Sequence, residues 1–424
     1  MFSCFLHLKL LLLLDSNFTY RGKNMKKILL VLFLLLSAAI TFATPKKFLF
    51  DATKAETAGN ADWVIDEDSS PQRFPTPLQT TVTASTPENY WTGALSSWGI
   101  RLVQLGNNVE TLPSGTPITY GNTSNVQDLS NYDVYVICEP NSPFTTIEKT
   151  AIMNFVQNGG GLFLISDHAG ADRNGNGYDA IRVLNDLIRN NTVQSNGFGV
   201  IFDSLNFSET TSNILTNGAS NVILNGQQGS VSQLKFSNGT SLTINPAFNS
   251  NARGVIWKTS SSQGNTGLMC ATTVYGSGRI CFIGDSSPPD DGTGGAGHTL
   301  YPGWTELGTN HSSLFINASL WIAKLSGVTA ITSTTTPVSF SLAQNYPNPF
   351  NPTTTIRFSV PKSEFVSLKI FDSMGREVNE LVSENLKAGD YQYNFSGNEL
   401  SSGVYHYTFS AEGLTQTKSM ILVK

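Results

Sequence analysis

Two kinds of pattern alternate along residues 44–328. Short, nearly continuous apolar runs occur at KFLF, DVYVIC, GLFLI and RICFI, and segments with apolar residues at helical spacing lie between them. Continuous apolar strands separated by helices are typical of a parallel sheet whose two faces are both covered. The pattern therefore predicts an α/β domain over residues 44–328, built on a mainly parallel, doubly wound sheet.

The segment TTIEKTAIMNFVQNGGG has the clearest helix boundaries in this domain. Thr145 and Glu148 have the spacing of a capping box, and Gly159 stands where the apolar period stops. These signals predict a helix that begins after Thr145 and ends before Gly159. Apolar residues at helical spacing predict three further helices, the last two of them amphipathic, within residues 87–106, 179–191 and 310–327.

A hairpin is predicted in the turn-rich part of the domain, at LKFSNGTSLTI. Its central dipeptide, Asn238-Gly239, is one of the pairs that favour a two-residue turn. The alternating residues on either side of this dipeptide predict two strands that pair with each other.

A second hairpin is predicted around VYGSGR, and it bears on the state of two cysteines. If Val274 pairs with Arg279, then Cys270 lies opposite Ile283 and diagonal to Cys281. That register favours two buried thiols over a disulfide, although a disulfide stays possible at this spacing.

A different pattern begins after residue 328. The Thr/Ser-rich residues 329–341 have no apolar period and are predicted to be a linker. Residues 342–424 consist of short alternating stretches separated by turns at Gly375, Gly389 and Gly403. Short strands at regular spacing predict a small, all-β, Ig-like sandwich at the C-terminus.

Residues 25–43 have the three parts of a secretory signal peptide. Lys26 and Lys27 follow Met25, an apolar stretch comes next, and TFA places the cleavage site near Ala43. The apolar stretch is short for a membrane span. Residues 1–24 fit no targeting pattern, so we expect Met25 to be the true start and the first 24 residues to be an over-long gene start.

The composition agrees with export and argues against nucleic-acid binding. Charged residues make up 13% of the chain, about half of the usual share, and Asn, Ser, Thr and Gly provide the polarity. The net charge of −5 leaves no basic surface for nucleic acid, so no nucleic-acid partner is predicted. No nucleotide cofactor is predicted either.

Polar side chains gather where the predicted strands end. Asp167 and His168 follow the run that ends at Ile165, and Asp285 and then His298 follow the run RICFI. Ligands of doubly wound sheets bind beyond the carboxyl ends of the strands, so we predict Asp167, His168, Asp285 and His298 as catalytic residues. Three further residues belong to the same edge: Asp51, Glu139 and His311.

Three mechanisms are open for this group. Asp and His ligands could hold a divalent ion that activates water for hydrolysis. Asp167 or Asp285 could instead act as a general base, with His168 as the acid. A Ser166 or Ser286 nucleophile is the weakest alternative, because the G-x-S-x-G turn is missing from the sequence.

The loop DRNGNGYD resembles the first half of a calcium-binding loop. Asp172, Asn174 and Asn176 stand at alternate positions, and Gly177 follows them, as in D-x-N-x-N-G. The twelfth position lacks the usual Glu, and Asp179 could complete the ligand set. The sequence predicts a site for Ca²⁺ or another divalent cation here; the alternative is a loop of Asx turns that needs no ion.

The C-terminal region resembles a known family over every block of its pattern. SLAQNYPNPFNPTTTIRFSVP, VSLKIFDSMGREV, LKAGDYQYNFSGNELSSGVYHYTF and the terminal KSMILVK resemble the type A C-terminal sorting domain of the type IX secretion system. The resemblance implies a β-sandwich and contact with the type IX secretion machinery. It also implies passage through the periplasm to the outer cell surface of a Bacteroidetes/Chlorobi-type bacterium, removal of the domain, and attachment to surface lipopolysaccharide.

Residues 46–328 are similar to the class I glutamine amidotransferase-like fold, in its ThuA-like branch. The segments LSNYDVYVICEP, TTIEKTAIMNFVQNGGGLFLISDH and VYGSGRICFIGDSSP carry the similarity. The resemblance implies a flavodoxin- or amidotransferase-like sheet. Amidotransferases have a Cys nucleophile after such a strand, whereas this chain has ISDHAG, so glutamine hydrolysis is not expected.

Two functions remain after this comparison. The first is an exported hydrolase of an unidentified extracellular substrate, whose glycan-related nature is implied only by the ThuA-like resemblance. The alternative is a non-catalytic, calcium-stabilised binding or scaffolding domain on the cell surface.

Overall fold

The computed structural model describes residues 45–424, except 69, 217–220, 227, 299, 326–327, 332–336, 387 and 398–399. The predicted signal peptide at residues 25–43 and the segment before it lie outside the described residues. Among the helices that are described, none combines the length and the apolar character that crossing a bilayer requires.

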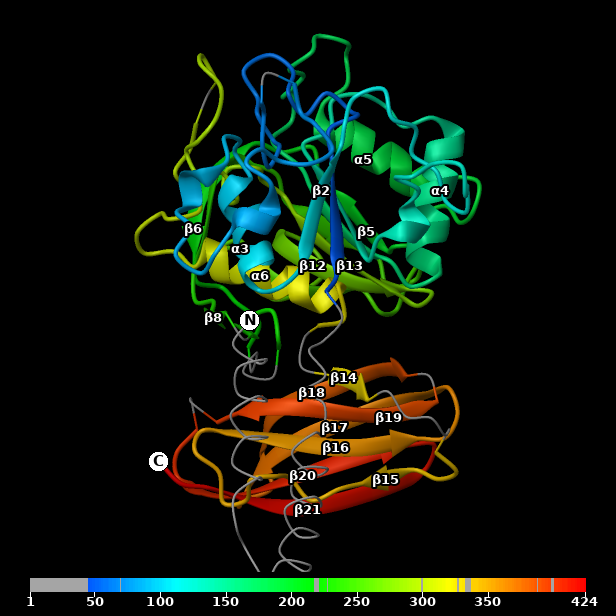
Figure 1. Ribbon diagram of the computed structural model, residues 1–424, viewed down its shortest axis with the longest axis vertical. Coiled ribbons are helices and arrows are strands. Elements are labelled where there is room, and N and C mark those ends of the chain that lie inside the picture. The colour runs from blue at the N-terminus through cyan, green and yellow to red at the C-terminus, as the bar shows by residue number, and fades with distance from the viewer. Residues whose placement is uncertain are drawn as a thin grey trace, which may run out of the picture. The chain divides into compact units, whose positions relative to one another are not determined.

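The described part of the α/β region is built on a nine-stranded sheet with the order β2-β1-β3-β4-β13-β12-β10-β5, in which β11 also pairs with β12 (Figure 1). The neighbouring strands from β2 to β13 are parallel, and the strands beyond β13 are antiparallel. This topology confirms the predicted α/β fold. The strands are β1 (Lys47–Asp51), β2 (Asn108–Leu112), β3 (Val134–Cys138), β4 (Gly161–Ile165), β5 (Val200–Phe202), β10 (Leu242–Ile244), β11 (Arg253–Trp257), β12 (Leu268–Tyr275) and β13 (Gly278–Ile283).

Helices cover both faces of this sheet because successive strand residues point to opposite sides. On β4, Phe163 and Ile165 face the core formed with α3 (Ser96–Gln104) and α6 (His311–Ile322). Leu162 and Leu164 face the opposite core, formed with α4 (Thr146–Gln157) and α5 (Ala180–Arg189). The continuous apolar runs of the sequence therefore reflect strands that are buried on both faces. Short 3₁₀ helices lie at Gln79–Thr81, Glu88–Tyr90 and Leu129–Asn131.

Local signals set the helix boundaries well, but the exposure of α6 was predicted wrongly. Thr145 and Glu148 form the expected capping box at the start of α4. Asp179 caps α5, whose apolar face is buried as predicted. In contrast, α6 is buried on nearly all sides, since it lies against β4, β13, α3 and the short hairpin of β7 (Asn225–Gly226) and β8 (Gly229–Ser230). The amphipathic prediction for residues 310–327 is therefore wrong.

The predicted hairpin at residues 234–244 is also wrong, although strands form on both sides of the dipeptide. β9 (Leu234–Gly239) pairs with β6 (Phe207–Thr211), whereas β10 pairs with β5 and β12. Asn238 does adopt the positive φ of 82° that its dipeptide signals. The chain then runs from the small β6–β9 sheet into the central sheet, and the N–H of Thr240 donates to the carbonyl of Gly284 at 2.7 Å. This long-range contact replaces the local pairing.

The hairpin of β12 and β13 has the predicted register. Val274 pairs with Arg279, and Cys270 pairs with Ile283. Cys270 and Cys281 are both buried as free thiols, so the structure agrees with the favoured alternative.

The C-terminal residues form two antiparallel four-stranded sheets that enclose a core of their own. This sandwich confirms the predicted all-β domain. Its first strand lies in the stretch that was predicted as linker, because Val328–Ile331 pair with residues 390–393. The strands are β14 (Val328–Ile331), β15 (Ser341–Leu342), β16 (Thr353–Val360), β17 (Glu364–Asp372), β18 (Glu377–Leu386), β19 (Gly389–Ser396), β20 (Gly403–Ala411) and β21 (Leu414–Leu422).

Candidate active site at the carboxyl ends of the parallel strands

Acidic residues from four neighbouring parallel strands lie at one edge of the central sheet. The strand register places Cys138, Ile165 and Ile283 level with one another, so the residues that follow them lie at the same edge. The chain adds β2 on one side of β1 and then crosses to add β3 and β4 on the other side. The boundary between β1 and β3 is therefore the switch point of the sheet, which is the usual place for a ligand in such folds. The acidic side chains that this edge collects are all buried: Asp51, Glu139, Asp167 and Asp285.

Glu139 is the fixed point of this group. It follows β3 with a φ of 49°, a conformation that non-glycine residues adopt rarely and that clusters at functional sites. Its N–H donates to the carbonyl of Ile165 at 2.9 Å. The fully buried carboxylate accepts hydrogen bonds from Nε of Arg173 and from Oγ of Ser286, the latter at 2.8 Å. The turn after β3 is thus bound to the loops after β4 and β13.

Arg173 connects two of the buried carboxyl groups. Besides its bond to Glu139, its Nη2 lies 3.4 Å from Oδ2 of Asp167. The other terminal nitrogen donates to Oδ1 of Asn60 at 2.7 Å, and the backbone N–H donates to Oδ1 of Asn141 at 2.5 Å. The guanidinium is therefore bound by protein acceptors, two of which are carboxyl groups.

Asp167 and His168 form the part of the group that reaches toward solvent. Nε2 of His168 lies 3.8 Å from Oδ2 of Asp167, and 24% of the His168 side chain is exposed. Burial raises the pKa of Asp167 well above its ordinary value, and the nearby charges of Glu139 and Asp285 raise it further. Asp167 therefore holds its proton more readily than an exposed aspartate does, and it lies beside an imidazole that solvent can reach.

Asp285 lies deeper and binds the backbone of β9 and of the loop after β13. Its Oδ2 accepts from the N–H of Ser237 at 2.5 Å, and its Oδ1 accepts from the N–H of Ser287 at 2.8 Å. Burial raises its pKa to about 6. A cavity of about 390 Å³ lies beside these two segments, and its lining includes Ser237, Ser287 and Tyr301. Asp285 thus shapes this cavity and acts on Asp167 through its charge.

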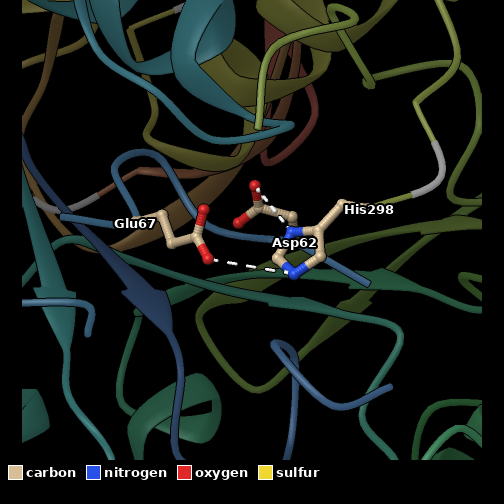
Figure 2. A group of neighbouring side chains, drawn as sticks. All are labelled: Asp62, Glu67 and His298. Carbon is tan, nitrogen blue, oxygen red and sulfur yellow. Dashed lines mark ion pairs between the residues drawn. The ribbon is translucent and has the colours of Figure 1, made fainter. Parts of the chain in front are cut away.

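His298 joins a different set of residues. Its Nδ1 lies 3.3 Å from Oδ2 of Asp62, and its Nε2 lies 3.8 Å from Oε1 of Glu67, as Figure 2 shows. Among the described residues, no hydrogen bond or ion pair connects His298 with Asp167, His168 or Asp285. The four predicted catalytic residues are therefore divided: Asp167 and His168 are adjacent, Asp285 is near them, and His298 belongs to the neighbouring Asp62–Glu67 pair.

The predicted cation loop is closed by hydrogen bonds of its own. Asp172 accepts from the N–H groups of Asn176 and Gly177 at 3.1 and 2.6 Å. Oδ1 of Asn174 also accepts from Asn176, and Oδ1 of Asn176 accepts from Tyr178.

Asp179 points its oxygens to other partners. Its Oδ1 caps α5 through the N–H of Arg182, and its Oδ2 accepts from Gly170 at 2.8 Å. These contacts match the Asx-turn alternative. A cation site at Asp172, Asn174, Asn176 and Asp179 stays a prediction, and an ion bound there would have to replace several of these N–H donors.

Several buried acids carried no usable signal in the sequence. Glu56 is fully buried beside Asp51, and burial together with the charge of Asp51 raises its pKa well above the ordinary value. Asp62 and Glu67 lie in the same acidic stretch, ETAGNADWVIDED, which has no periodicity from which burial could be inferred. Only the tertiary contacts distinguish its buried acids from the exposed ones.

A second cavity, of about 640 Å³, lies along β5 and β10 at the antiparallel edge of the sheet, and its lining includes Leu205, whose carbonyl accepts from the N–H of Ala169. Its lining includes Asp203, Ser241 and Lys258, and neither this cavity nor the one of about 390 Å³ is lined by any of the four predicted catalytic residues. We place the candidate site at the carboxyl ends of the strands because the buried, interacting titratable groups are found there.

Comparison with protein families decides the nature of the C-terminal sandwich. Residues 344–424 match the family described as the secretion system C-terminal sorting domain. The sandwich is a sorting domain. The resemblance seen in the sequence is thereby confirmed, and the sorting domain marks the protein as secreted cargo of the type IX secretion system. No curated protein matches the chain.

Solved structures similar to the chain align with it weakly. The mmIFT52 N-terminal domain has 12% identity and a TM-score of 0.40, with 65% of this chain and 97% of that chain covered. A ThuA-like protein from Parabacteroides merdae ATCC 43184 has 14% identity and a TM-score of 0.34, with coverages of 66% and 90%. An endo-β-1,4-mannanase from Thermotoga petrophila has 16% identity and a TM-score of 0.15, with coverages of 26% and 23%. The fold assignment therefore rests on the observed strand order of the α/β domain.

Proposed function

We propose that the protein is exported as type IX cargo and that its α/β domain is a hydrolase of an extracellular substrate. In this proposal the signal peptide is removed near Ala43, and the sorting domain directs the chain to the outer cell surface. Removal of the sorting domain and attachment to lipopolysaccharide would then leave the α/β domain displayed outside the cell.

The observation that carries the hydrolase proposal is the placement of Asp167. Its carboxyl group is buried between the charges of Glu139 and Asp285, which raise its pKa, while His168 beside it is partly exposed. Neighbouring titratable groups in different environments are a frequent basis of acid–base catalysis. Asp167 would donate a proton to the leaving group, and His168 would accept the proton of the attacking water, which reverses the roles suggested by the sequence.

Glu139 and Arg173 have a positioning role in this proposal. Burial raises the pKa of Glu139 and the guanidinium of Arg173 opposes that rise, while the charge of Glu139 in turn raises the pKa of Asp167. Neither residue has to touch the substrate in this proposal. We expect both to affect catalysis only by changing the pKa and the position of Asp167.

The chemistry of the cavity beside Asp285 favours a neutral, hydroxyl-rich substrate. Ser237, Ser287 and Tyr301 contribute hydroxyl groups, and Pro288 and Pro302 contribute flat apolar surface. Lys235, which also lines the cavity, pairs with Glu306. Arg173 pairs with Glu139 and Asp167, so both cations already have carboxylate partners. A glycan-related substrate fits these features.

The test is hydrolysis of a panel of chromogenic glycosides and acyl esters by the purified full-length chain, which still carries the sorting domain. We expect Asp167→Asn and His168→Ala to lower kcat/KM by about 100-fold or more, the range of general acid–base contributions. His406→Ala in the sorting domain is the matched control. Equal activity of wild type and Asp167→Asn would refute the acid–base assignment. Binding to a glycan array without hydrolysis would replace the hydrolase by the surface-binding alternative.

A further inference from the structure

Residues 62–67 and residues 294–298 meet beside the candidate active site, although more than half of the chain separates them (Figure 2). Asp62, Glu67 and His298 each offer one ligand atom, and these atoms all lie within 4.8 Å of one another. Figure 2 shows the imidazole of His298 between the two carboxyl groups, with one ring nitrogen facing each. One ligand atom of each side chain therefore lies close enough to the other two to share an ion.

Within the part of the chain that the structure describes, two buried polar atoms at this point lack hydrogen bonds. Asp62 is 2% exposed, and its Oδ1 has no hydrogen-bond partner there. Nδ1 of His298 is also buried without a hydrogen bond, although Oδ2 of Asp62 lies 3.3 Å away. The contact thus has ion-pair distance without hydrogen-bond geometry. Leaving such atoms unsatisfied is unfavourable, and a bound cation would satisfy both residues.

The backbone of the second segment closes tightly around the two carboxylates. The N–H of Gly295 donates to Oδ2 of Asp62 at 2.9 Å. A Cβ atom at Gly294 would lie 2.4 Å from Oδ2 of Asp62, and one at Gly295 would lie 2.2 Å from Oε2 of Glu67. Glycine at both positions allows the loop to approach, and it leaves the carboxylates oriented toward His298.

We propose that Asp62, Glu67 and His298 bind one divalent transition-metal ion, with Zn²⁺ the best fit and Mn²⁺ the alternative ion. One imidazole and two carboxylates form a mixed nitrogen–oxygen ligand set that suits these ions. Three protein ligands leave a coordination position for water. The side chains of His298 and Glu67 are 15% and 22% exposed, so solvent reaches the site from their side.

The ion would join two segments that are otherwise distant in the chain. The Gly295–Asp62 hydrogen bond already spans 233 residues, and the ion would strengthen the same contact. The proposed acid–base group of Asp167 and His168 does not depend on this ion. The metal site and the hydrolase proposal can therefore be tested separately.

The test is titration calorimetry of the full-length chain, stripped with EDTA, against Zn²⁺ and against Mn²⁺. We expect one equivalent to bind to wild type, and Asp62→Asn and His298→Ala each to weaken binding by about tenfold or more, since even outer partners of metal ligands change affinity by this factor. His168→Ala is the matched control, because it removes a histidine from the same edge and should leave metal binding unchanged.

A second variant keeps the test decisive if a buried substitution prevents folding. Glu67→Gln changes a ligand that is partly exposed, and we expect Zn²⁺ to raise the Tm of wild type and of His168→Ala but not of Glu67→Gln. Wild type that binds neither ion would overturn the proposal and leave His298 as a plain ion-pair partner. Binding that persists unchanged in Asp62→Asn and His298→Ala would overturn it as well.

Discussion

Nε of Arg173 donates a hydrogen bond to Oε1 of Glu139, and this contact joins the loop after β4 to the turn that ends β3. Glu139 is fully buried with a positive φ, so the arginine neutralises a charge at a position where the backbone is already strained. The same guanidinium lies near Asp167. One cation thus maintains the arrangement of the carboxyl groups on which the proposed acid–base chemistry depends.

Removal of this cation should destabilise the α/β domain strongly. We expect Arg173→Met to lower the free energy of unfolding by about 3 kcal/mol, because it leaves Glu139 buried without its charge partner. Denaturant unfolding measures this loss. Arg376→Met is the matched control, since Arg376 pairs with Asp372 while 72% of its side chain is exposed, and its loss should be below about 1 kcal/mol. Equal losses in the two variants would contradict the buried pairing.

Stability should decrease as pH rises from mildly acidic to mildly alkaline values. Burial raises the pKa of Asp285 to about 6 and that of Asp290 to about 7, from 3.8 in both cases. Between the pKa of 3.8 in the unfolded state and the raised pKa in the folded state, the folded protein binds more protons than the unfolded protein. The free energy of unfolding therefore falls as pH increases. A rise in the pKa of Asp285 from 3.8 to about 6 changes the free energy of unfolding by about 3 kcal/mol at most.

Thermal unfolding in EDTA at about pH 5 and about pH 8 measures this effect. We expect the higher Tm at the lower pH, and a smaller pH dependence in Asp285→Asn, which cannot ionise at that position. A Tm that increases toward pH 8 would contradict the raised pKa values.

The loop that contains Asp172 allows its two interpretations to be separated. Asp172 accepts two backbone N–H groups, so Asp172→Ala should lower the free energy of unfolding by about 1–2 kcal/mol. If the loop is a set of Asx turns, the loss is equal in calcium and in EDTA. A larger loss in calcium, measured by the same unfolding experiment, would instead confirm the predicted cation site.

The cysteines of the α/β domain should behave as unreactive thiols in the folded protein. Cys138, Cys270 and Cys281 are buried and free, and burial raises the pKa values of Cys138 and Cys281. We use the chain from which the leader has been removed. We expect a thiol reagent to leave the native protein unmodified, and to label three cysteines once the protein is unfolded without reductant. A single labelled cysteine would indicate a Cys270–Cys281 disulfide.

Patterns over a few residues predicted the buried parallel strands β1, β3, β4 and β13 and the helices α4 and α5. The capping box of Thr145 and Glu148 set the start of α4, and the turn at Val274–Arg279 set the register that separates Cys270 from Cys281. Both depend on backbone geometry within one turn or one hairpin. The failed hairpin at Asn238-Gly239 marks the limit of this reasoning: the local turn signal was present, but pairing with distant strands determined the path of the chain.

The sequence by itself determined the order of strands and helices, the C-terminal sorting domain, and the polar residues that follow β4 and β13. These features depend on the spacing of apolar side chains along the chain and on motifs of consecutive residues. The tertiary structure alone decided which partners those residues have: Arg173 for Glu139 and Asp62 for His298. The reason is physical, because burial and charge pairing arise where segments distant in the chain pack together, and the acidic stretch around Asp62 shows no local period that reveals which of its side chains will be covered.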